Sequence, residues 1–247
     1  MKTTTIYALI GSWAGQNSHT GQLCDKLAEE LIRQTGSSCQ YIKKTADQWN
    51  IGFCRSCGQC FRTGFCPQTP IDGMQQICQE IQNADFLIIG TPVYAASLSG
   101  STKNLVDRLS LWLHTMPLIG KVCAIITTTS TNHAEDCIPY LTEIFGLMGA
   151  SVAAHGSAYV TSGHPLLTSA DEIHDLAVSM ASSMLEAVGN PAYFTATQQL
   201  YFLKQNRRYR AIKELSGLFP AVGELRCWER QGYFECEDLA GALKRSI

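Results

Sequence analysis

Apolar and polar positions along residues 1–190 follow a pattern that predicts strands separated by helices. Short, continuous apolar runs are typical of strands buried on both faces of a sheet. They predict strands at 5–10, 39–42, 85–90, 122–126 and 151–160. Apolar residues at helical spacing predict helices at 18–34, 74–81, 105–112, 139–148 and 170–188. Strands that alternate with helices form a parallel sheet covered on both faces, so an α/β domain is expected over 1–190.

The pattern changes after Asn190 and Pro191. Residues 194–219 are basic, aromatic and mainly helical in pattern, and a second aromatic stretch follows at 227–235. We therefore predict a helical C-terminal extension over 191–247. The pattern is compatible with a packing arm, a lid, a dimer contact or a docking surface for a redox protein, and it favours packing.

The composition narrows the class of protein further. The hydrophobic fraction of 45% in 247 residues is enough for a large core, and the net charge of −2 gives no sign of a nucleic-acid partner. The opening MKTTTIYALIG lacks the length and the cleavage site of a signal peptide. Since no stretch reaches the roughly 18 apolar residues that a membrane helix needs, we expect a cytoplasmic protein without a membrane partner.

Three loops that follow predicted strands carry the candidate chemistry, because ligands of open parallel sheets bind beyond the carboxyl ends of the strands. The first, GSWAGQNSHTG at 11–21, is rich in hydroxyl and amide side chains and leads into a helix. Such a loop can bind a phosphate monoester through helix N-terminal amides and hydroxyls. It matches neither the dinucleotide fingerprint nor the P-loop. A serine-rich helix cap without a ligand is the alternative.

The second loop, at 90–108, contains a Thr-Pro turn and then Tyr94, whose aromatic face suits a flavin ring. On the helix that follows, Lys103, Asp107 and Arg108 are expected on a solvated or salt-bridged face. The third loop, TTTSTNH at 127–133, offers five hydroxyls for a ring or ribityl chain, or a cap for the next helix. No histidine has an identifiable partner, so no catalytic residue is predicted.

Two of these segments together resemble a known family. GSWAGQNSHTGQL is similar to the phosphate loop of the NAD(P)H-dependent FMN reductases with a flavodoxin-like fold, and ADFLIIGTPVYAASLSGSTKNLVDR to their second loop and helix. With the cysteine-rich segment 54–66 between them, the chain resembles the iron–sulfur flavoprotein branch over roughly residues 4–188. The resemblance implies a doubly wound, five-stranded parallel sheet of order 2-1-3-4-5. It also implies FMN, a homodimer or higher homo-oligomer, and NAD(P)H as a possible electron donor.

The resemblance also implies a set of FMN-binding residues. The phosphate is expected at Ser12, Gln16, Asn17, Ser18 and Thr20, the ring near Thr91, Pro92, Val93, Tyr94 and Ser97, and further contacts at Thr128 and Ser130. This chain departs from the family at two places. Trp13-Ala14 stands where Pro-Arg is frequent, which removes a cation, and Ile71-Asp72-Gly73 lacks one carboxylate of a frequent acidic pair.

Four cysteines, Cys54, Cys57, Cys60 and Cys66, are spaced C-x2-C-x2-C-x5-C, and a proline follows the last. In a chain without an export signal, such a cluster points to metal binding or redox chemistry. The spacing is close to that of [4Fe–4S] ligands, and Gly64 can turn the chain so that Cys66 reaches the same cluster. Metal-free thiols, as free thiols or a disulfide, are the first alternative. A zinc site is the second, although zinc ligands usually come as two separate pairs.

Three functions are compatible with these features. The first is an FMN-dependent oxidoreductase that passes electrons between FMN and a [4Fe–4S] cluster or an external acceptor. The second is a cluster-free NAD(P)H-dependent FMN or quinone reductase. The third is a non-enzymatic electron carrier or redox sensor that docks a protein partner.

Overall fold

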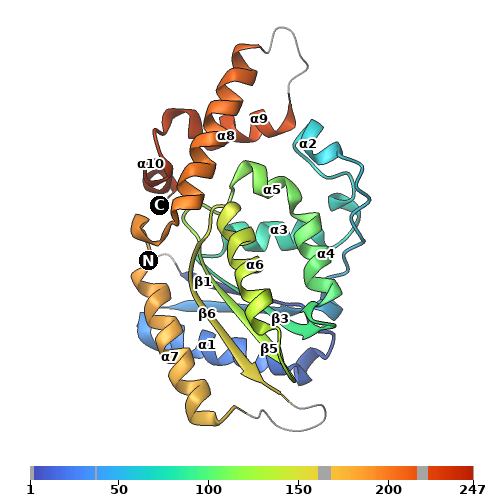
Figure 1. Cartoon of the computed structure of the whole chain (residues 1–247), viewed down its shortest axis with the longest axis vertical. Helices are drawn as coiled ribbons and strands as arrows, with labels where there is room; N and C mark the ends of the chain where they lie inside the picture. The colour runs from blue at the N-terminus through green and yellow to red at the C-terminus, as the bar shows by residue number, and fades with distance from the viewer. Residues whose placement is uncertain (1–2, 37, 161–167, 216–221, 247) are drawn as a thin grey trace.

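The computed structural model describes residues 3–36, 38–160, 168–215 and 222–246. Five strands form a parallel sheet of order β2-β1-β3-β5-β6 (Figure 1). They are β1 (Thr4–Ile10), β2 (Cys39–Thr45), β3 (Phe86–Tyr94), β5 (Val122–Thr129) and β6 (Ser151–Tyr159). This order confirms the flavodoxin-like prediction. A sixth strand of two residues, β4 (Ser97–Leu98), pairs antiparallel with the end of β3.

Helices cover both faces of the sheet because successive strand residues point to opposite sides. On one face, α1 (His19–Thr35) and α7 (Ala170–Glu186) pack on Ile6, Ala8 and Ile10 of β1. On the other face, Tyr7 and Leu9 meet the four helices that follow β2, β3 and β5. These helices are α3 (Met74–Asn83), α4 (Gly100–Arg108), α5 (Ser110–Thr115) and α6 (Ala134–Leu147).

Several boundaries differ from the sequence prediction. The strands β2 and β5 each run three residues past their predicted ends, so residues 127–129 belong to β5 rather than to the third loop. Residues 91–94 belong to β3 rather than to a loop, since Thr91 and Pro92 pair with β5 and the next two residues pair with β4. The helix predicted at 105–112 consists of α4 and α5, which meet at Leu109. The helix predicted from Pro139 begins five residues earlier, at Ala134, with Glu135 and Asp136 in its first turn, where carboxylates stabilise a helix.

The C-terminal extension is helical, as predicted, and consists of α8 (Ala196–Glu214), α9 (Gly223–Gln231) and α10 (Leu239–Ser246). Its aromatic core surrounds Trp228, which is fully buried among Phe202, Tyr209 and Tyr233. The extension stands above α5, at one end of the molecule (Figure 1). The division at residue 190 stays a prediction. No helix within the described ranges is long and apolar enough to cross a membrane.

Candidate functional site

A cavity of about 850 Å³ lies at the carboxyl edge of the sheet. Residues after β1, after β2 and after β3 line it, and several are aromatic. They include Gly11 and Trp13, then Asp47, Trp49, Asn50 and Phe53, then Tyr94, Ser99, Ser101 and Asn104. The volume falls within the range of about 300–1,000 Å³ that is usual for small-molecule sites.

Buried hydroxyls hold the first and second loops together. The Ser99 hydroxyl donates to the Gly11 carbonyl at 2.6 Å, and Thr102 Oγ1 donates to Thr91 Oγ1 at 3.0 Å. Gly11 has no room for a side chain, because a Cβ there would lie 1.8 Å from Thr102 Oγ1. The N-terminus of α4 is therefore fixed against the end of β1.

The predicted phosphate loop leads into α1, whose N-cap is Ser18. Its hydroxyl accepts a hydrogen bond from the Gly21 amide at 3.1 Å. The first-turn amides of His19 and Thr20 precede any intrahelical acceptor, so they can bind an anion. His19 Nδ1 is buried and has no hydrogen-bond partner among the described residues. A buried ring nitrogen at a helix N-terminus is placed to form a hydrogen bond with a phosphate oxygen.

The predicted FMN residues occupy different environments. Six of them are buried: Ser12, Ser18, Thr20, Thr91, Pro92 and Thr128. Val93 is half-buried. The other five are exposed: Gln16, Asn17, Tyr94, Ser97 and Ser130. Thr20 Oγ1 and Thr128 Oγ1 lie 2.6 Å apart, so the structure brings the first and third loops together. Of the predicted set, Tyr94 lines the 850 Å³ cavity. These assignments stay predictions.

The loop after β2 supplies cavity residues that the sequence reasoning missed. Asp47 and Asn50 line the cavity from a short 3-10 helix and the turn after it, and Trp49 lines it while packing in the core. The signal was available in principle, because the end of β2 lies at the same edge of the sheet as the other loops. Ser99, Asn104 and His19 were missed as well.

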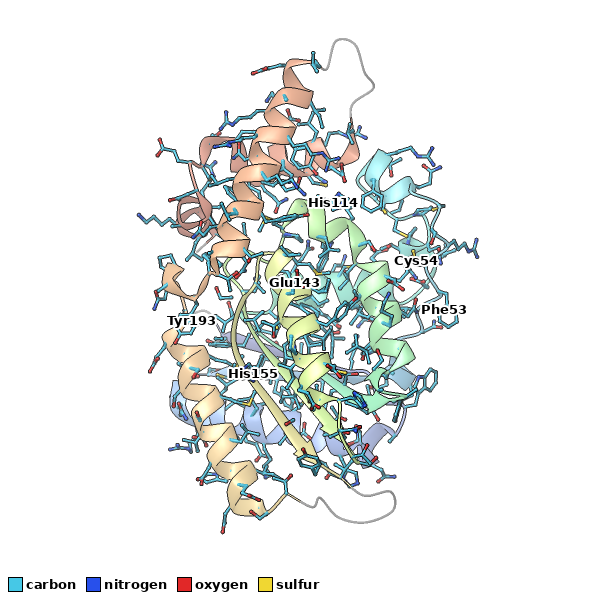
Figure 2. The ribbon with its side chains drawn as sticks, in the orientation of Figure 1. Phe53, Cys54, His114, Glu143, His155 and Tyr193 are labelled. Carbon is cyan, nitrogen blue, oxygen red and sulfur yellow. The ribbon has the colours of Figure 1, made fainter. Side chains whose placement is uncertain are left out.

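The four-cysteine segment follows this loop and lies at the outer edge of the molecule, where Figure 2 shows Cys54 beside Phe53. Cys54 and Cys57 are exposed, whereas Cys60, on α2 (Gln59–Thr63), and Cys66 are half-buried. Gly64 ends α2 in a left-handed conformation with φ of 77°, which is the turn expected there. Burial raises the pKa of the Cys60 thiol, and the nearby Cys66, Cys54 and Cys57 raise it further.

A [4Fe–4S] cluster needs four cysteine thiolates as ligands. No group of three or more Cys, His, Asp or Glu side chains in the described ranges is arranged as ligands around one point. The other three thiols nevertheless lie near enough to raise the pKa of Cys60, and two of the four are half-buried, so the set has the chemistry of [4Fe–4S] ligands. The residues present therefore fit a cluster in type and number.

Arg108 lies between the cavity and the cysteine segment. Its Nη1 lies 2.8 Å from the Gly52 carbonyl and 2.5 Å from Asp72 Oδ2, and its side chain is 0% exposed. Burial opposes the charge of Arg108, but Asp72 and Cys66 raise its pKa. Its Nε is buried without a partner among the described residues. Of the two expected environments, solvated or salt-bridged, Arg108 has the salt bridge and is buried, whereas Lys103 and Asp107 form an exposed pair.

The comparison with family models identifies the protein family of this chain. The model of the NADPH-dependent FMN reductase family matches residues 4–165, more than half of the chain. The chain belongs to this family. The resemblance to FMN reductases is thereby confirmed, and the C-terminal extension lies outside the matched residues.

Curated relatives carry the name iron–sulfur flavoprotein. One from Archaeoglobus fulgidus is 33% identical over 86 residues, which is 35% of this chain and 40% of that protein. One from Clostridioides difficile is 22% identical over 189 residues, covering 74% of this chain and 80% of that protein. The chain spans 40% and 56% of the lengths of two Archaeoglobus fulgidus relatives.

Solved structures share the fold. An NADH:FMN oxidoreductase in its apo form has a TM-score of 0.54 at 22% identity, covering 78% of this chain and 94% of that one. RosB with bound 8-demethyl-8-formylriboflavin-5'-phosphate has a TM-score of 0.59 at 16% identity, with 86% and 87% covered. These likenesses show the flavodoxin-like fold.

Proposed function

We propose that this protein is an FMN-dependent oxidoreductase in which electrons pass between FMN and a [4Fe–4S] cluster held by Cys54, Cys57, Cys60 and Cys66. Membership of the FMN reductase family supports FMN as the cofactor. The names of the curated relatives and the four cysteines within residues 54–66 support the cluster. The observation that carries the proposal is the four-cysteine segment, whose first thiol, Cys54, directly follows the cavity-lining Phe53.

The chain's own residues would bind and orient both groups. The amides of His19 and Thr20, with the hydroxyls of the loop 12–20, would bind the FMN phosphate. Tyr94 and Trp13 would line the ring site, and the hydroxyls of Ser99 and Thr102 keep its walls fixed. When bound, FMN supplies one- and two-electron chemistry and the cluster supplies one-electron transfer.

Between the two groups, Arg108 would contribute a fixed positive charge. The guanidinium is paired with Asp72 and contacts the Gly52 carbonyl, and Gly52 also lines the cavity. A buried cation stabilises added negative charge in its surroundings, because screening by water is weak there. We expect a homodimer or higher homo-oligomer, with NAD(P)H as electron donor or with a redox protein as partner.

A cluster-free NAD(P)H-dependent FMN or quinone reductase is the second candidate. Cys54 and Cys57 are exposed, which is typical of thiols that react directly with oxidants or with each other. Turnover with NADH or NADPH separates both candidates from a carrier that accepts electrons only from a protein.

The deciding experiment measures iron, acid-labile sulfide and FMN per chain in protein purified without oxygen. About four iron and four sulfide per chain support the cluster. Cys60→Ser should lose most of the iron and keep FMN. The matched control Cys39→Ser, at the first residue of the edge strand β2, should keep both. FMN without iron, even after anaerobic reconstitution, would contradict the cluster and leave the second candidate.

A further inference from the structure

The backbones of α2 and α9 touch at two glycines, Gly64 and Gly223. A Cβ on Gly223 would lie 1.8 Å from the Gly64 nitrogen and 2.3 Å from the Thr63 carbonyl carbon. Both are main-chain atoms, which cannot move aside as a flexible side chain can. Figure 1 shows the two helices side by side, although more than 150 residues separate them in sequence. The first residue of α9 must therefore be a glycine if α2 is to keep its place.

Two further residues of α9 contact the same end of α2. Arg226 Nη2 lies 3.4 Å from the Thr63 carbonyl oxygen. The sulfur of Cys227 lies against Gly64, at 3.4 Å from where its Cβ would be. Gly64 lies between Cys60 and Cys66, so α9 contacts the chain between these two thiols.

The helix α9 is itself fixed to the body of the protein. Trp228 Nε1 donates to the His114 carbonyl at 2.8 Å, and Gln231 Nε2 donates to the Thr115 carbonyl at 2.9 Å. The Tyr233 hydroxyl donates to the Met116 carbonyl at 2.9 Å. These three donors bind successive carbonyls at the end of α5. A movement of α9 relative to the sheet would break the two hydrogen bonds made by its own residues, Trp228 and Gln231.

His114 provides a second connection to the cysteine segment. Its ring lies 5.0 Å from the ring of Phe61, the residue after Cys60. Its Nδ1 lies 2.5 Å from Glu224 Oε1, and the Glu224 side chain is 3% exposed. Figure 2 shows His114 at the end of α5, close to α2. The second residue of α9 and the residue after Cys60 therefore contact the same imidazole.

We propose that α9 of the C-terminal extension positions Cys60 and Cys66 for the four-thiol site, with Gly223 and Arg226 as positioning residues. The inference rests on the proposed function, because it gives the extension a role toward that thiol set. The contacts of α9 reach the Cys60–Cys66 half of the segment, and these are the two half-buried thiols, whereas Cys54 and Cys57 are exposed. The extension thus fixes and shields one half of the site and leaves the other open.

The test substitutes Gly223→Ala in the full chain and compares it with Gly241→Ala. Gly241 lies on α10 in the same extension, and a Cβ there would come no closer than 3.3 Å, to a side-chain oxygen. In metal-free, reduced protein, alkylation of each cysteine by iodoacetamide is followed by peptide mass spectrometry. Gly223→Ala should speed alkylation of Cys60 and Cys66 about threefold or more, since local opening exposes them. Cys54, already exposed, should react at the wild-type rate.

Protein that contains iron gives an independent measurement on the same variants. Gly223→Ala should lose iron faster than Gly241→Ala in air and shift the electron paramagnetic resonance spectrum of the reduced protein. Arg226→Ala changes an exposed side chain, so it keeps the fold, and should give the same changes on a smaller scale. If near-ultraviolet circular dichroism shows that Gly223→Ala has displaced Trp228, the Arg226→Ala variant is the one that tests whether α9 positions the two thiols.

Equal alkylation of Cys60 and Cys66 in Gly223→Ala, Arg226→Ala and Gly241→Ala would overturn the inference. A wild-type protein that takes up no iron contradicts the proposed cluster instead. The alkylation rates still decide in that case whether α9 positions the two thiols.

Discussion

The hydroxyls of Thr20 and Thr128 share a hydrogen bond of 2.6 Å that joins the first turn of α1 to the end of β5. Both side chains are buried, at 2% and 3% exposure. The bond therefore connects the helix that follows the predicted phosphate loop to the carboxyl end of β5.

Removing both partners of this bond should cost less than the sum of the two single losses. Thr128→Val leaves the Thr20 hydroxyl buried without a partner, so the free energy of unfolding should fall by about 1–3 kcal/mol. Thr20→Val should do the same, and the double variant should lose less than the sum of the two. Urea unfolding of the four proteins of this cycle measures the coupling. Additive losses would show that the two hydroxyls do not act as a pair.

The ion pair between Asp72 and Arg108 should make stability depend on pH. Burial raises the pKa of Asp72, but hydrogen bonds from Arg108 and from the Met74 and Gly52 amides outweigh it, and the net pKa is lowered. A lowered folded-state pKa means stabilisation that is present above the unfolded pKa of about 4. It is lost as the pH falls through the folded-state value.

Asp72→Asn should accordingly lower the free energy of unfolding by about 3 kcal/mol at pH 7, because it leaves Arg108 buried without its counter-charge. The difference from wild type should shrink as the pH falls below about 4. Urea unfolding from pH 3 to 7 measures it. Asp107→Asn, which breaks the exposed pair with Lys103, is the control and should cost under about 1 kcal/mol. A difference that is constant over this pH range would contradict the assignment.

Trp13 can report whether a flavin ring occupies the 850 Å³ cavity. It is 70% exposed and lines the cavity, while Trp49, Trp112 and Trp228 are at most 9% exposed. In protein without FMN, acrylamide should quench a fluorescence component that Trp13→Phe removes. Adding FMN or riboflavin should protect this component from acrylamide, because the ring covers the indole. Unchanged quenching in the presence of bound FMN would place the ring away from Trp13.

The strands of the sheet could be predicted because the signal is local and repeated, whereas their order was implied by the family resemblance. Ile6, Ala8 and Ile10 face one helical layer and Tyr7 and Leu9 face the other, so both faces of β1 must be apolar. A strand of this kind can be read from a few neighbouring residues. The same holds for the serine cap of α1, which precedes its helix directly.

Much of the candidate site could not be predicted, since it depends on contacts between distant residues. The Arg108 side chain pairs with Asp72, which lies 36 residues away, and nothing in its own helix indicates that it is buried. The turn after β3 places Ala95 and Ala96 at φ of 48° and 59°, a conformation that alanine does not signal in sequence. In the sequence, nothing distinguishes Trp49 from an ordinary core residue. Its contact with the cavity results from the path of the loop after β2.

His19 should contribute to FMN affinity through the phosphate group alone. Its Nδ1 is buried at the N-terminus of α1 without a partner among the described residues, so a phosphate oxygen can take that place. His19→Ala should weaken FMN binding about two- to tenfold, the range of one hydrogen bond of 0.5–1.5 kcal/mol. Riboflavin, which has the ring without the phosphate, should bind both proteins equally well. Titration of FMN-free protein by flavin fluorescence measures both affinities, and His155→Ala, on the exposed side of β6, is the control. Equal losses for FMN and riboflavin in His19→Ala would mean that His19 supports the fold of the loop rather than the phosphate.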